Sequence, residues 1–123
     1  MTADPGADRA TRIALGLSGA GHIVHNLAEF PASVLWGPET LVPLAVTAVV
    51  GWLLLARPGR GAAAVATGWA MIVIVGGGGS VLPLGVLPFT PEQSASHYGA
   101  HVAYAALQLP LAWVGFRGLR ARE

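Results

Sequence analysis

Residues 13–29, IALGLSGAGHIVHNLAE, form an apolar stretch that is interrupted by polar side chains at intervals of four, three and four residues. In an α-helix these intervals place all of the polar side chains on one face. Ionisable groups are expensive in a lipid bilayer, so such a stripe is expected to face the interior of a helical bundle. The members of this first stripe are Ser18, His22, His25 and Glu29.

Residues 97–108, HYGAHVAYAALQ, carry a second stripe with the same intervals. We expect the two helices to be antiparallel neighbours, with the centres of their apolar stretches at equal depth. Glu29 then lies level with His101, which becomes its expected partner, while His97 lies near the outer interface as a solvated residue. The other expected pairs are His25 with Tyr104 and His22 with Gln108.

The composition predicts a membrane protein with a single domain, residues 1–123. The chain is 54% hydrophobic and only 11% charged, whereas a soluble domain is about a quarter charged. Between Arg12 and Arg57 the only formal charges are Glu29 and Glu39. No basic run is interleaved with aromatic residues, which argues against nucleic acid as a partner. Cysteine is absent, which excludes disulfides and thiolate metal sites.

We expect an all-α, four-span transmembrane helical bundle. Each span has about the 20 residues needed to cross the hydrocarbon. The third span reaches this length only by including the glycines that are expected to break it. Ser94 or Ser96 is expected to cap the start of the last helix. The four predicted spans are residues 13–36, 39–56, 61–79 and 96–116.

The arginines predict the topology. All seven basic residues lie at the N-terminus, between the second and third spans, or at the C-terminus, and the other two connections contain none. The positive-inside rule therefore places both termini in the cytoplasm of a multi-pass plasma-membrane protein. A bundle of this size has little room for a large cavity, so we expect a homo-oligomer or a larger membrane complex in the lipid bilayer.

The connection formed by residues 76–93, GGGGSVLPLGVLPFTPEQ, is irregular and apolar. Its four consecutive glycines and three prolines disfavour a regular helix. Irregular backbone at membrane depth must lie against protein or a wet cavity. We expect this loop to fold over the outer mouth of the bundle, and the alternative is an interfacial loop among the lipid headgroups.

Two cofactor hypotheses follow from the stripes. Three imidazoles and a carboxylate suit a transition metal such as Zn, Fe or Cu, and the fragment His25-Asn26-x-x-Glu29 resembles the metal-helix motif of ZIP-type transporters, although the chain is too short to be such a transporter alone. A haem b would instead need one axial histidine from each helix, His25 or His22 together with His101. The expected metal ligands are His22, His25, Glu29 and His101.

Two further interpretations need no cofactor. The polar side chains can hydrogen-bond one another and lock the helices, or a partner, together as in a non-catalytic membrane subunit. They can also form a pathway for protons or small solutes. A metal with an open position would activate water, but no residue pattern specifies a substrate. In each case the supporting polar residues are Ser18, Tyr104, Gln108 and His97. The preferred hypothesis is a metal or haem site that serves redox chemistry or ion handling.

Overall fold

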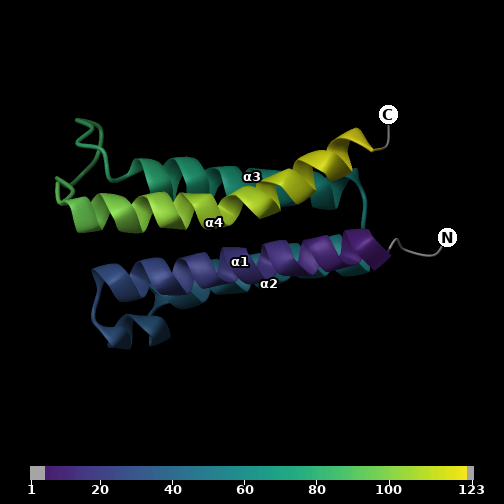
Figure 1. Cartoon of the computed structure of the whole chain (residues 1–123), viewed down its shortest axis with the longest axis horizontal. Coiled ribbons are helices and arrows are strands. Elements are labelled where there is room, and N and C mark those ends of the chain that lie inside the picture. The colour runs from purple at the N-terminus through teal and green to yellow at the C-terminus, as the bar shows by residue number, and fades with distance from the viewer. Residues whose placement is uncertain (1–4, 122–123) are drawn as a thin grey trace.

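The computed structural model describes residues 5–121, and within that range it is all-helical, with no strand. Four long helices run alternately in opposite directions, and both described ends of the chain lie at the same end of the bundle (Figure 1). α1 packs against α2 and α4, and α3 packs against α4. The elements are α1 (Pro5–Glu29), η1 (Ala32–Trp36), α2 (Pro38–Ala56), α3 (Arg60–Ile72), η2 (Val73–Gly78) and α4 (Ala95–Arg120).

The two ends of the bundle differ in charge. The start of α1, the α2–α3 connection and the end of α4 come together at one end, here called the arginine end (Figure 1). Glu29, Glu39 and Glu92 belong to the opposite end, here called the glutamate end. The described basic residues of the arginine end are Arg9, Arg12, Arg57, Arg60, Arg117 and Arg120.

The first helix differs from the predicted span of residues 13–36. α1 begins at Pro5 and ends at Glu29, where the amide of Phe30 still donates to the Asn26 carbonyl at 2.9 Å. Pro31 then ends the helix, because proline disfavours the helical conformation of the residue before it and cannot donate a hydrogen bond. The remaining residues form the short 3₁₀ helix η1.

The glycine run does not break the third helix as expected. α3 continues through η2 as a π-helix that ends at Gly78. A Cβ on Gly77 would lie 2.5 Å from Cε1 of Tyr104, and one on Gly78 would lie 2.9 Å from Cβ of Ala105. The missing side chains therefore allow α4 to lie directly against the wide π turn. The expected N-cap of α4 is confirmed, since Oγ of Ser94 accepts a hydrogen bond from the amide of His97 at 3.3 Å.

The interior of the bundle holds polar side chains among mostly small apolar ones, while large apolar side chains cover its outer faces. A soluble helix bundle shows the reverse pattern, with its large apolar side chains buried. Here Trp36 is 81% exposed and Val102 is 66% exposed, whereas Gln108 is fully buried. Outer faces of this kind fit an apolar surrounding such as lipid or further helices. The buried polar residues are Thr11, Ser18, His22, Asn26, Thr40, Thr47, His101 and Gln108.

Two helical segments in the described chain are long and apolar enough to cross a membrane: α2, and the continuous segment Arg60–Gly78 formed by α3 and η2. Each of them has 19 residues. α1 and α4 are longer, with 25 and 26 residues, but their polar stripes lower their hydropathy. The four-helix, all-α architecture agrees with the sequence-based prediction, and the structure supports two candidate spans within it.

Gly77 offers a test of the contact between η2 and α4. Gly77→Ala is expected to lower the free energy of unfolding by about 1–2 kcal/mol, because the new methyl group would displace the packed ring of Tyr104. The matched control is Gly76→Ala, since a Cβ on Gly76 would meet nothing within 4 Å. Thermal unfolding of both variants in the same detergent measures the difference. Equal stability of the two variants would contradict the close contact.

Candidate functional site

The two polar stripes face each other, in a register that differs from the expected one. The expected pairing of Glu29 with His101 is wrong, because Glu29 pairs with His97 and His101 pairs with His25. The expected pairing of His22 with Gln108 is wrong by the same helical turn. The intervals of four, three and four residues are the same when they are counted from either end of a stripe. Two antiparallel stripes can therefore pair along their whole length, and in the observed register each member of one stripe has a partner in the other. The pairs are Ser18 with Gln108, His22 with Tyr104, His25 with His101 and Glu29 with His97.

His22 is fully engaged by hydrogen bonds in the bundle interior. The hydroxyl of Thr47 donates its proton to the Pro43 carbonyl at 2.8 Å, so its oxygen is an acceptor for the indole N–H of Trp69 at 3.1 Å and for Nε2–H of His22 at 3.4 Å. Nδ1 of His22 then accepts from the Tyr104 hydroxyl at 2.7 Å. Neither ring nitrogen is left to bind a metal. The structure therefore places His22 in the scaffold, one turn away from the other histidines.

Asn26 fixes the tautomer of His25. The amide nitrogen of Asn26 donates to the Glu39 carbonyl at 3.2 Å and to the Thr40 hydroxyl at 2.6 Å. Its amide oxygen therefore faces Nδ1 of His25, 3.0 Å away, and that nitrogen must be the donor. A neutral His25 ring consequently carries its lone pair on Nε2.

His101 is oriented in the same way by the π-helix. Its Nδ1 lies 2.6 Å from the Gly77 carbonyl, which can only accept, so Nδ1 carries the proton. Nε2 of His101 lies 3.3 Å from Nε2 of His25, and the ring planes are nearly perpendicular, at 86°. Assigned from these partners, both Nε2 atoms of two neutral rings would be acceptors, so neither could donate a hydrogen bond to the other. A proton on one of the two nitrogens would turn this contact into a hydrogen bond.

A cavity of about 300 Å³ opens beside this histidine pair at the glutamate end. His97, expected to be solvated, is instead half-buried, and its Nδ1 donates to the Glu29 carboxylate. The α3–α4 loop contributes Ser80, Phe89 and Pro91 to the wall. The other lining residues are His25, Glu29, Phe30, His97 and His101.

Only part of the expected ligand set converges. His25 and His101 meet through their Nε2 atoms, and Glu29 lines the same cavity but is held by His97. Among residues 5–121 no group of three or more His, Asp or Glu side chains is arranged to hold a metal ion. A metal at this place would therefore start from two imidazole ligands and recruit the others from the cavity.

The aromatic rings form a continuous column. His97 and His101 have ring centroids 4.5 Å apart, and His25 stacks on Tyr104 at 4.5 Å with an interplanar angle of 26°. Tyr104 then reaches His22, 5.3 Å away. Beyond Ser18 and Gln108, the next positions of the two stripes are apolar, and the column ends in a packed cluster. The buried members of this cluster are Ala14, Val50, Ala66, Ala70 and Leu111.

The column is therefore open toward the glutamate end and closed by apolar packing toward the arginine end. Three of its supporting residues were not predicted from the sequence, namely Thr40, Thr47 and Trp69, and Asn26 was noted only within the metal-helix motif. Thr40 and Thr47 lie seven residues apart on one face of α2, which is a signal that the sequence did offer. No protein-family model, no curated protein and no solved structure matches this sequence.

Proposed function

We propose that the chain is a four-span integral membrane protein with both termini in the cytoplasm. The apolar exterior and the polar side chains of the interior support the crossing of α1 and α4 beside the two apolar helical segments. α1 and α4, with 25 and 26 residues, exceed the length of about 20 residues that a span requires. The arginines at one end of the bundle support a cytoplasmic arginine end.

Within this bundle we propose that His25 and His101 bind a divalent transition-metal ion that enters from the glutamate end. The observation that carries this proposal is the 3.3 Å separation of two Nε2 atoms whose ring protons both lie elsewhere. Two imidazole ligands of a tetrahedral ion, each about 2.0–2.1 Å from the metal, are separated by about 3.4 Å. The pair therefore already has the spacing of one edge of such a site.

The surroundings of the pair support the same ligand role. Metal-binding histidines commonly donate their second ring N–H to a carbonyl or carboxylate, which fixes the ring and raises its basicity. Asn26 provides such an acceptor for His25, and the Gly77 carbonyl provides it for His101. Glu29 and water in the cavity are the candidates to complete the coordination. Nitrogen and oxygen ligands without sulfur suit Zn²⁺, Fe²⁺ or Cu²⁺.

A single ion fits this geometry better than a haem b. Axial histidines must lie on opposite faces of a macrocycle, whereas the rings of His25 and His101 contact each other directly. α1 and α4 would have to separate to admit the porphyrin. The role we propose is ion handling, namely binding a metal from the outer side of the membrane.

The second candidate function is a proton site in a non-catalytic membrane subunit. A proton shared between the same two Nε2 atoms also satisfies the pair, and the ring column from His97 to His22 supports a proton relay. Among the described residues, no buried side-chain nitrogen or oxygen lacks a hydrogen-bond partner. This completeness supports a role for the stripes in locking the helices together.

Metal binding separates the two candidates. Purified protein in lipid nanodiscs, stripped with chelator and titrated with Zn²⁺ or Co²⁺, is expected to bind one ion per chain. His25→Ala and His101→Ala should each weaken binding by about 100-fold or more, since each removes one of two preformed ligands. His22→Gln is the matched control and should keep the wild-type affinity. Unchanged affinity in His25→Ala, or no binding by the wild type, would overturn the metal proposal, and a Soret band would favour haem instead.

A further inference from the structure

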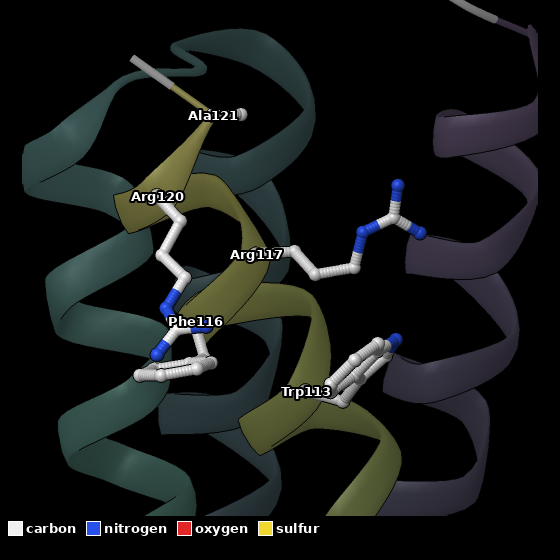
Figure 2. Close-up of a pocket in the computed structure, with 5 residues that line it drawn as sticks. All are labelled: Trp113, Phe116, Arg117, Arg120 and Ala121. Atoms are coloured by element: carbon white, nitrogen blue, oxygen red, sulfur yellow. The ribbon is translucent and has the colours of Figure 1, made fainter. Parts of the chain in front are cut away.

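The end of α4 carries a second group of functional side chains, far from the histidines. Figure 2 shows Arg117 extending from α4 toward α1, with Trp113 one turn earlier on the same helix. Arg120 folds back over the ring of Phe116, and its guanidinium carbon lies 4.3 Å from the ring centroid. Two guanidinium groups and two aromatic rings thus share the surface of the last turns of this helix.

Arg117 lines two neighbouring cavities. One cavity of about 310 Å³ lies over the surface of α4 and is lined by Trp113, Phe116, Arg117, Arg120 and Ala121. A second cavity of about 270 Å³ shares Trp113 and Arg117 and continues between α4 and the first turns of α1. The guanidinium of Arg117 can therefore meet a ligand that lies in this groove.

The charges of this surface favour an anion. Among residues 5–121, no carboxylate lies within ion-pair distance of Arg117 or Arg120, and the ion pair of Glu29 with His97 is at the opposite end. Asp8 lines the second cavity, whereas the lining of the first cavity contains both arginines and no acidic residue. Arginine binds phosphate oxygens through a planar set of donors.

The aromatic residues specify the rest of the ligand. Trp113 is 59% exposed and Phe116 is 40% exposed, and both lie toward the middle of the bundle from the arginines. Tryptophan is enriched at the interface between headgroups and hydrocarbon. A phospholipid has its phosphate at this depth and its acyl chains alongside such rings, whereas a free anion would use only the arginines.

We propose that Arg117 and Arg120 bind the phosphate of an anionic phospholipid, whose acyl chains lie along Trp113 and Phe116. This inference rests on the proposed membrane orientation, in which the arginine end faces the cytoplasmic leaflet. Basic pockets at the cytoplasmic ends of transmembrane helices are suited to anionic headgroups. The site differs from the proposed metal site in location, in charge and in ligand.

The test is lipid binding by the purified full chain, measured by native mass spectrometry in detergent with phosphatidylglycerol and phosphatidylcholine. Phosphatidylglycerol is expected to bind more tightly than phosphatidylcholine. The double variant Arg117→Gln/Arg120→Gln should lose affinity for phosphatidylglycerol by about 30-fold. The double variant Arg9→Gln/Arg12→Gln removes the same charge from the same end and should keep the wild-type affinity.

Three outcomes would overturn the proposal: equal binding of both lipids, an equal loss in both double variants, or complete displacement of phosphatidylglycerol by inorganic phosphate. The last outcome would assign the arginines to a soluble anion. Flotation of the wild-type protein with liposomes tests the membrane orientation separately. A chain that fails to float removes the proposed function itself, whereas a floating chain without lipid preference removes only this site.

Discussion

Gly115→Ala is expected to be among the most destabilising single substitutions in this chain, lowering the free energy of unfolding by about 3 kcal/mol. A Cβ at this position would lie 2.5 Å from Oγ1 of Thr67, 2.8 Å from the backbone nitrogen of Thr67 and 3.0 Å from the carbonyl oxygen of Ala63. Two of these atoms belong to the backbone of α3 and cannot rotate away. The methyl group would therefore force α3 and α4 apart along the seam where small residues bring them together.

The measurement is thermal or denaturant unfolding in one detergent, followed by tryptophan fluorescence. Gly99→Ala is the matched control in the same helix, because a Cβ at Gly99 would meet nothing within 4 Å. Alanine is the better helix former by about 1 kcal/mol, so this control should be neutral or slightly stabilising. A similar stability of the two variants would show that α3 and α4 do not lie as close together as the structure has them.

The sequence predicted the helical class and the inward-facing stripes because both depend on local periodicity. Ser18, His22, His25 and Glu29 all face α4, as their intervals indicate. Periodicity gives the face of a helix but not its sliding position against a neighbour. The expected register relied on the centres of the apolar stretches, and α1 in fact begins and ends earlier than its predicted span. Pairing all members of both stripes would have been the better criterion.

The partners that decide the chemistry were harder to predict, since several of them are backbone groups. The Gly77 carbonyl determines which nitrogen of His101 carries the proton, and it reaches that ring only because the glycine run continues as a π-helix. Glycine runs usually indicate a break, so local propensity pointed the other way. Thr40 and Thr47 share one face of α2, but the sequence does not show which groups they meet, and the contacts of Thr47 with His22 and Trp69 appear only in the structure.

His22→Ala is expected to lower the free energy of unfolding by about 3 kcal/mol while leaving metal binding intact. His22 is 1% exposed, and removal of its imidazole leaves a cavity and takes away the acceptor of the Tyr104 hydroxyl. His25 is less buried, so His25→Ala should cost less stability and yet weaken metal binding by about 100-fold or more. The two variants are therefore expected to give opposite patterns in unfolding and in Zn²⁺ titration.

Opposite results for the two variants distinguish a histidine that stabilises the fold from a histidine that binds the metal, and they do so more clearly than either variant alone. The interval between His22 and His25 is compatible with both residues binding one ion, which is why the sequence placed them in a common ligand set. The hydrogen bonds of His22 to Tyr104 and Thr47 argue against that grouping. If His22→Ala loses Zn²⁺ with little change in unfolding, these bonds do not hold the ring, and His22 returns to the metal. If both variants lose stability and neither alters Zn²⁺ binding, the histidine column serves only to hold the helices together.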